Sequence, residues 1–143
     1  MARKLVFCFL LLSSKAFADY TINHELIYDD RQVPVINLAY NIAKKEGFKN
    51  PELLPAIIYK ESKAGVHPNY KKAGPKSSPY YGLGQMKVGT AKDTIKKNPE
   101  LKEIIKNDII YTMMYDRKAA LTIVAKHLID LGINKNTQKA IMA

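Results

Sequence analysis

A single glutamate, Glu61, is a candidate acid at the end of the apolar segment LLPAIIYKES. Leu54, Ile57 and Ile58 recur at helical spacing, and Glu61 follows the two isoleucines by four and three residues. This spacing places its carboxyl group on, or at the edge of, the apolar face of a helix. Because a carboxyl group that loses solvation there favours its protonated form, we expect Glu61 to deliver a proton to a leaving group. The spacing also fits a surface glutamate paired with a neighbouring lysine.

The element that carries this acid is predicted to be a helix that ends near Ser62. Asn50 supplies its cap and Pro51 its first position, where the missing N–H costs little. The segment before it, VPVINLAYNIAKKEGF, has apolar residues on one face and predicts a helix over residues 33–46. Gly47 ends that helix. Two helices therefore lead up to the candidate acid.

Residues 63–81 are predicted to form a long loop, because glycines and prolines interrupt any regular element. Long loops inside compact domains are commonly functional. No strand pattern of any length appears, so the expected fold class is all-α, or α with a minor hairpin in the loop. Further helices are expected from a cap at Thr90, from Asn98–Pro99 to about Lys106, from Asp108 or Asp116 through a long apolar stripe to Gly132, and from near Asn136.

The first 18 residues have the pattern of a secretory signal peptide. Arg3 and Lys4 precede an apolar run over residues 5–12, and Ala16 and Ala18 form a small-residue cleavage site. The run is too short to span a bilayer as a stable helix. A retained N-terminal anchor is the alternative, which the small-residue site disfavours. The expected mature domain covers residues 19–143.

The expected mature domain is basic and has no cysteine. The full chain of 143 residues has 23 basic and 13 acidic residues, and removal of residues 1–18 leaves 20 basic and 13 acidic, a net charge of +7. Without cysteine, disulfides and thiolate metal sites are excluded. A basic exported protein fits a polyanionic surface such as a cell wall or membrane. Nucleic acid is not expected as a partner, since no aromatic and basic interleaving or known motif supports it.

An ordered set of short motifs follows the candidate acid. Glu61-Ser62 is followed by Ser78-Pro79, then by Gly82-Leu83-Gly84-Gln85, and then by Thr90-Ala91. This set resembles the soluble lytic transglycosylase family of the lysozyme-like superfamily, in the small single-domain type found in secretion and conjugation systems. The resemblance covers roughly residues 35–143 and is strongest over 53–92. It implies a compact helical lysozyme-like domain, α+β at most, with a long active-site loop.

The resemblance implies cleavage of the β-1,4 bond between N-acetylmuramic acid and N-acetylglucosamine in peptidoglycan. Glu61 would be the single acid/base, which protonates the glycosidic oxygen and then takes a proton from the muramic C6 hydroxyl group. The product would carry a 1,6-anhydro end, and no water would be consumed. Most glycosidases use two carboxylates. Here Asp93 and Asp116 are the nearest alternatives in sequence, and both fit better as helix-start residues.

The resemblance and the residue types imply roles for further residues. The substrate-binding positions would be Ser78, Tyr81, Gly82, Gln85 and Met86. Ser78 would place a hydroxyl group near the acid, and Gln85 an amide in the cleft. Tyr81 would offer an aromatic face to a sugar ring. Gly82 and Gly84 would let the backbone approach the glycan closely. Ser62 and Thr90 would give structural support at helix ends. No cofactor is implied, and no metal is expected because the three histidines, His24, His67 and His127, show no ligand spacing.

One part of the family pattern is not reached by this sequence. The family has a tyrosine-asparagine motif soon after a segment like TQKAIMA, and the chain ends at Ala143. Either the sequence is truncated before this motif, or the protein lacks part of its cleft. A muramidase that hydrolyses the same bond, or a non-catalytic peptidoglycan-binding assembly protein, remain alternatives. The expected partners are glycan strands and a secretion or conjugation machine, and the expected protein is a periplasmic or secreted monomer.

Overall fold

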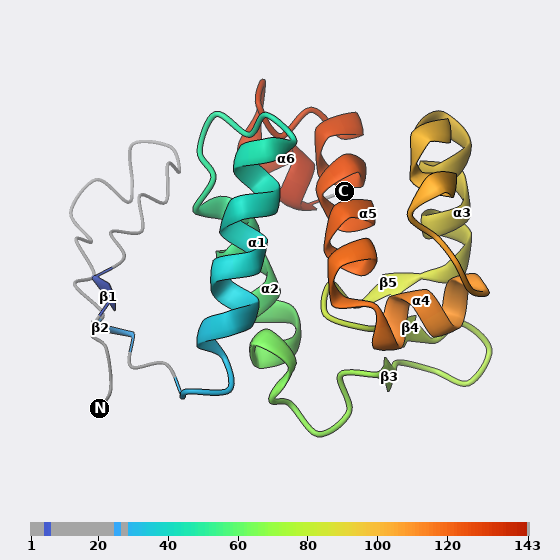
Figure 1. The fold of residues 1–143 in the computed structure, drawn as a ribbon, viewed down its shortest axis with the longest axis horizontal. Helices are drawn as coiled ribbons and strands as arrows, with labels where there is room; N and C mark the ends of the chain where they lie inside the picture. Colours follow the sequence, from blue (N-terminus) through green and yellow to red (C-terminus); the bar gives the residue numbers. More distant parts are fainter. Residues whose placement is uncertain (1–4, 7–24, 27–28, 143) are drawn as a thin grey trace.

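A computed structural model describes residues 5–6, 25–26 and 29–142 of the chain (Figure 1). The predicted signal peptide lies outside the described residues, apart from the two residues of the short strand β1 (Leu5–Val6). This strand pairs with β2 (Glu25–Leu26) in antiparallel register. Within the described ranges, no helix combines the length and the apolar character needed to cross a membrane.

The described part of the chain is mostly helical and carries one small three-stranded antiparallel sheet, in the order β3-β4-β5. The expected α-rich fold with a minor hairpin in the loop is confirmed at this level. The helices are α1 (Val33–Lys45), α2 (Leu53–Ser62), α3 (Val88–Lys97), α4 (Ile109–Tyr115), α5 (Arg117–Asp130) and α6 (Thr137–Met142), with 3-10 turns η1 (Lys63–Gly65) and η2 (Pro99–Glu103). The sheet strands are β3 (Lys72–Ala73), β4 (Tyr80–Tyr81) and β5 (Met86–Lys87).

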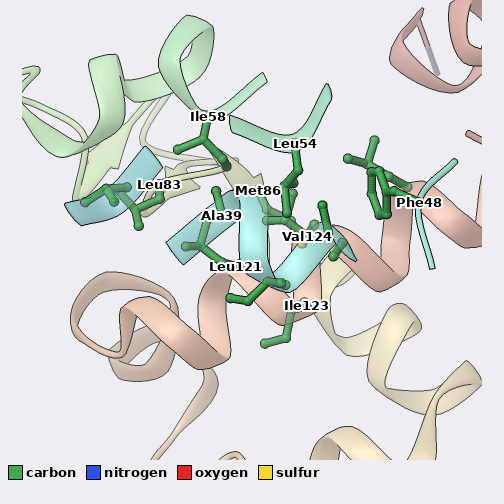
Figure 2. Packing of buried hydrophobic residues seen from close by; sticks show 14 of the residues in the cluster. Ala39, Phe48, Leu54, Ile58, Leu83, Met86, Leu121, Ile123 and Val124 are labelled. Carbon is green, nitrogen blue, oxygen red and sulfur yellow. The ribbon is translucent and has the colours of Figure 1, made fainter. Parts of the chain in front are cut away.

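The centre of the fold is α5, which packs against α1, α3 and α4 (Figure 1). Leu121 and Ala125 are fully buried although they lie outside the apolar stripe predicted for this helix. Neighbouring helices cover more than one face of α5. A surface helix buries one apolar stripe, whereas α5 buries residues on more than one side. Figure 2 shows the core formed by α1, α2 and α5, with Ala39, Ile58 and Leu121 among its side chains. Burial of each large aliphatic side chain contributes about 1.5–3 kcal/mol.

The helix that carries Glu61 starts later than predicted. Its first residue is Leu53 and its N-cap is Glu52, with no side-chain cap. Asn50 and Pro51 form a separate turn, in which Asn50 accepts the backbone N–H of Leu53 at 3.2 Å through its carbonyl oxygen. The asparagine oxygen Oδ1 accepts the N–H of Glu52 at 3.3 Å. Asn50 therefore caps the turn and not the helix, because the chain makes a tight bend before the helix begins.

The helix after the loop starts earlier than predicted. We expected Thr90 as its cap, whereas α3 begins at Val88 with Lys87 as N-cap and no side-chain cap. Strand β5 runs directly into the helix, and Lys87 keeps an extended backbone with ψ of 148°. Thr90 lies in the first turn, and Asp93 lies inside the helix and not at its start. The start of α3 is therefore set by the preceding strand β5 and not by a local cap residue.

Both aspartates proposed as the start of the long helix begin a helix. Asp108 accepts the N–H groups of Ile110 and Tyr111 at 3.0 Å, and α4 follows. Asp116 accepts the N–H of Ala119 at 3.0 Å, and α5 follows. The expected helix from Pro99 to Lys106 is instead a short 3-10 turn that ends at Glu103.

The sequence allowed a minor hairpin but did not locate the three strands, because each has only two residues, too few to show an alternating pattern. Tyr81 pairs with Lys72 of β3 on one side and with Met86 of β5 on the other. A tight turn joins β4 to β5, in which Gln85 donates its backbone N–H to the carbonyl oxygen of Gly82 at 3.1 Å. The GLGQ segment is therefore a hairpin turn, and it lies beside α4 (Figure 1).

Candidate active site

Glu61 is exposed at the end of α2 and makes no side-chain hydrogen bond or ion pair with any described residue. The expectation that this carboxyl group loses solvation on the apolar face of the helix is therefore wrong. The apolar face of α2 runs through Leu54, Ile58 and Ser62, which are four residues apart and all fully buried. Glu61 lies about a quarter of a helical turn away from that face, on the side of α2 that carries the half-buried Ile57. Its side chain is exposed to solvent.

Ser62, and not Glu61, is the buried residue at the end of α2. Its hydroxyl group donates a hydrogen bond to the carbonyl oxygen of Ile58 at 3.1 Å. The hydroxyl oxygen Oγ of Ser62 accepts the backbone N–H of Gly65 at 3.2 Å. Ser62 therefore holds the turn that follows α2 and has no exposed surface on which to react.

The turn behind Glu61 has three consecutive residues in the left-handed region. The φ angles are +51° for Lys63, +52° for Ala64 and +85° for Gly65. A residue with a side chain in this conformation costs roughly 1–2 kcal/mol, so the surrounding structure must hold the first two. Gln32 does so in part, because its Nε2 donates to the carbonyl oxygen of Lys63 at 2.9 Å.

Gln32 was missed by the sequence reading. It is a buried polar residue at the N-cap of α1, and its Oε1 accepts the backbone N–H of Asp29 at 2.9 Å. Its amide therefore connects the chain before α1 to the turn after α2. Nothing in the local sequence marks this residue, since its partner is 31 residues away.

The turn behind Glu61 packs against the GLGQ hairpin. A Cβ atom on Gly65 would lie 3.0 Å from Cδ2 of Leu83 and 3.8 Å from the ring of Tyr70. Leu83 is buried, and Tyr70 packs partly against the core. The structure thus brings together the two motifs that the sequence analysis paired, Glu61-Ser62 and Gly82–Gln85.

The glycines of this hairpin serve packing inside the protein. A Cβ atom on Gly82 would lie 1.9 Å from the carbonyl oxygen of Met113, and φ of this glycine is +70°. A Cβ atom on Gly84 would lie 2.4 Å from Cγ2 of Val124. We expected both glycines to let the backbone approach a glycan. The close approach is instead to α4 and α5, which leaves no room for a side chain at either position.

Gln85 uses its amide nitrogen within the protein. Its Nε2 donates to the carbonyl oxygens of Tyr70 at 2.7 Å and Gly82 at 2.8 Å. Its φ is +47°, so this residue has the turn conformation that glycine usually supplies. Among the described residues its Oε1 has no hydrogen-bond donor. The amide oxygen, and not the amide nitrogen, is therefore what Gln85 can offer to a sugar.

Met86 is buried in the core and is not available to a substrate (Figure 2). Tyr81 is half-buried and packs partly against the same core. Ser78 is half-buried, and its backbone N–H donates to the carbonyl oxygen of Pro75 at 3.0 Å. Of the expected substrate-binding residues, Ser78, Tyr81 and the oxygen of Gln85 keep exposed surface, whereas Met86 and Gly82 do not.

Thr90 lies apart from these residues, in the first turn of α3. Its carbonyl oxygen accepts the hydroxyl group of Thr94 at 2.9 Å. The Thr94 hydroxyl also lies 3.3 Å from Nδ1 of His127, whose pKa is lowered by burial. The expected support by Thr90 is therefore within α3 and α5 and does not involve the turn behind Glu61.

The charge around the candidate acid is one-sided. Residues 53–92 contain Glu61 as their only acid, together with seven lysines. Within the described residues, no group of three His, Cys, Asp or Glu side chains could hold a metal ion. The site therefore offers one exposed carboxyl group in a cationic surrounding, and its lysines are Lys60, Lys63, Lys71, Lys72, Lys76, Lys87 and Lys92.

Comparison of the chain with protein-family models, with curated proteins and with solved structures found no match. What the protein can do therefore follows from its own residues. These are an exposed acid at a helix end, a turn held rigidly behind it, and a hairpin with one available amide oxygen.

Proposed function

We propose that this chain is a peptidoglycan lytic transglycosylase with a lysozyme-like fold. The observation that carries the proposal is the placement of Glu61, whose carboxyl group meets solvent while the turn behind it is fixed by Ser62 and Gln32. A general acid must be exposed to substrate and held in one place. The resemblance of its motifs to the soluble lytic transglycosylases supplies the substrate and the reaction.

In this proposal the glycan completes the environment that Glu61 lacks. A sugar strand that covers the carboxyl group removes water from it, and this favours the protonated form. Glu61 then gives its proton to the glycosidic oxygen, and the N-acetylglucosamine side leaves as an alcohol. The N-acetyl group of the muramic sugar assists at C1. The resulting Glu61 carboxylate then takes the proton of the muramic C6 hydroxyl group while the C6 oxygen forms its bond to C1.

The remaining residues would orient the strand. The free Oε1 of Gln85 would accept a hydrogen bond from a sugar hydroxyl or N-acetyl N–H group. Tyr81 and Ser78 would contact the strand from the loop side. Given the expected signal peptide, the protein would act in the periplasm or outside the cell. A role beside a secretion or conjugation machine is proposed by analogy only.

The proposal is tested by digestion of purified sacculi, with mass spectrometry of the released fragments. We expect 1,6-anhydro ends from the wild type, and a rate about 10²–10⁴-fold lower for Glu61→Gln. Glu103→Gln is the matched control, because Glu103 is another exposed glutamate in a short helical turn. Reducing ends in place of anhydro ends would identify a muramidase instead.

A non-catalytic wall-binding protein is the second candidate. It is favoured by the internal use of Gly82, Gly84, Met86 and the Gln85 nitrogen, which leaves few groups for a substrate. A sedimentation assay with insoluble peptidoglycan separates the two functions. If wild type and Glu61→Gln both bind equally and neither releases fragments, the chain binds the wall and does not cut it.

A further inference from the structure

Helix α4 exposes two tyrosines that form an aromatic pair. Tyr111 is 48% exposed and Tyr115 is 51% exposed. Their ring centroids are 4.9 Å apart, with planes tilted by 40°. The two residues are one helical turn apart and so lie on the same face of α4. A pair of tyrosine rings offers apolar faces with polar edges, which suits the C–H faces and hydroxyl groups of a sugar.

A lysine from the active-site loop lies against this pair. The Nζ of Lys71 is 4.6 Å from the centroid of the Tyr115 ring, within the range of a cation–π interaction. Lys71 is exposed, and its ammonium group keeps access to solvent. The aromatic pair thus carries one positive charge over the ring of Tyr115.

The contacts that place Lys71 also connect it to the candidate active site. Its carbonyl oxygen accepts the backbone N–H of Gly82 at 3.2 Å. Gly82 in turn packs against the carbonyl group of Met113 in α4. Residue 70, next to Lys71 in the chain, accepts the amide of Gln85. The loop, the GLGQ hairpin and α4 are therefore held together, and the aromatic pair lies on the helix against which the hairpin packs.

The charge of the region indicates what this surface binds. Seven lysines and a single acid lie between residues 53 and 92, whereas Asp108 and Asp116 lie at the two ends of α4, where their carboxylates cap α4 and α5. Two further lysines of the region lie over tyrosine rings, Lys63 over Tyr59 at 4.9 Å and Lys87 over Tyr80 at 5.3 Å. A neutral glycan can contact the tyrosine rings but gains nothing from the charge of the lysines. A sugar that carries a carboxylate can place its ring on the tyrosines and its charge on a lysine.

We propose that Tyr111, Tyr115 and Lys71 form a binding site for a glycan ring that bears a carboxylate-containing substituent. The inference rests on the proposed function for the class of glycan, and it adds a site on α4 outside the motif residues. This site distinguishes a wall strand with acidic substituents from a neutral strand of the same linkage. Chitin is such a neutral strand, since it has β-1,4-linked N-acetylated sugars and no carboxylate.

Binding to insoluble peptidoglycan and to insoluble chitin tests the site, with Glu61→Gln as the background so that no strand is cut. We expect a preference for peptidoglycan that decreases with salt. The double variant Tyr111→Ala/Tyr115→Ala should bind both glycans roughly tenfold more weakly. Lys71→Gln should lose roughly threefold on peptidoglycan and nothing on chitin. Two variants serve as controls. Ile104→Ala removes another exposed large apolar side chain, Lys102→Gln removes another exposed lysine, and both should bind as the background does.

Several results would overturn the site. Equal affinity of the double variant and the background would exclude the tyrosines as glycan contacts. Equal losses on both glycans for Lys71→Gln would exclude a contact between the lysine and a carboxylate of the glycan. Undiminished binding of all variants to vesicles with anionic lipids, tighter than to peptidoglycan, would indicate a membrane surface instead. Circular dichroism confirms that each variant is folded. Failure of the proposed function is seen separately, as absence of released fragments from a wild type that still binds through Tyr111 and Tyr115.

Discussion

At the scale of single residues, Glu61 and Ser62 are neighbours in the chain with opposite environments. The glutamate is exposed, and the serine has no exposed surface. The helix period explains the difference, because Ser62 continues the buried row of Leu54 and Ile58. The acid is therefore positioned by its neighbour, whose hydroxyl group bridges the last turn of α2 and the turn after it.

Removal of that hydroxyl group should loosen the turn behind Glu61. We expect Ser62→Ala to lower the free energy of unfolding by about 1–2 kcal/mol, since the Gly65 N–H loses its acceptor in a partly buried turn. Urea denaturation measures the change. Ser77→Ala, at an exposed position in the loop, should stay within about 0.5 kcal/mol of the wild type. Equal stability of Ser62→Ala and Ser77→Ala would contradict the role given to Ser62.

At the scale of elements, the turn between β4 and β5 fits between α4 and α5. Gly82 approaches the backbone of α4, and Gly84 approaches Val124 of α5. Backbone groups cannot move aside as a flexible side chain can. The hairpin can therefore pack this closely against α4 and α5 only because Gly82 and Gly84 have no side chains.

Two glycine substitutions test this fit. Gly82→Ala should lower the free energy of unfolding by about 3 kcal/mol, because its Cβ would overlap the Met113 carbonyl oxygen in a backbone conformation with φ of +70°. Gly89→Ala should raise it by up to about 1 kcal/mol, since Gly89 lies in α3 and a Cβ there meets no atom within 4 Å. Thermal unfolding of both variants measures the contrast. A tolerated Gly82→Ala would show that the hairpin can move away from α4.

At the scale of the whole molecule, α5 carries the charges and the histidine that connect distant segments. Lys126 Nζ lies 3.0 Å from carboxylate oxygens of both Glu46 and Glu100, which follow α1 and lie in η2. The hydrogen bond to Lys126 lowers the pKa of Glu100, and the two carboxylates raise the pKa of Lys126. The next residue, His127, is half-buried, and burial lowers its pKa below the ordinary 6.5.

Stability should fall as the pH drops through the range in which His127 titrates. The unfolded chain takes up the proton near pH 6.5 and the folded chain only at lower pH, so the stabilisation is complete above 6.5 and is lost below it. The charge of Asp130 opposes the shift and that of Lys97 adds to it. Melting temperatures measured at about pH 7.5 and pH 5.5 should differ less for His127→Gln than for the wild type. His67→Gln, at an exposed histidine, should keep the difference, and an unchanged difference in both variants would exclude His127 as its source.

How much the sequence could predict depends on where the partner of each residue lies. The caps at Asp108 and Asp116 and the stop at Gly47 have their partners within a few residues, and the structure confirms them. Gln32 and the buried side of α2 have partners in other elements, and no local pattern reveals those. The sequence therefore left two positions open for Glu61, on the apolar face or on the surface, because the side of α2 that is buried depends on α1.

The candidate site follows the same division. The turn that follows α2 packs against the GLGQ hairpin, where Gly65 meets Leu83. The sequence did not reveal that Met86 enters the core or that the Gln85 nitrogen binds the loop, since both depend on contacts that form only when α4 and α5 are in place. The exposed tyrosines of α4 carry no motif at all.

The two crowded glycines have a consequence for how such chains are recognised in genomes. Because Gly82 and Gly84 are required by neighbouring helices, selection for a folded protein alone would retain them. A descendant that had lost every trace of enzymatic chemistry would still carry the GLGQ letters and would still be counted by a motif search. Glu61 has no such constraint, since no described residue depends on it. In a set of related sequences, drift at position 61 beside unchanged glycines would therefore mark the lineages that kept the scaffold and lost the proposed reaction.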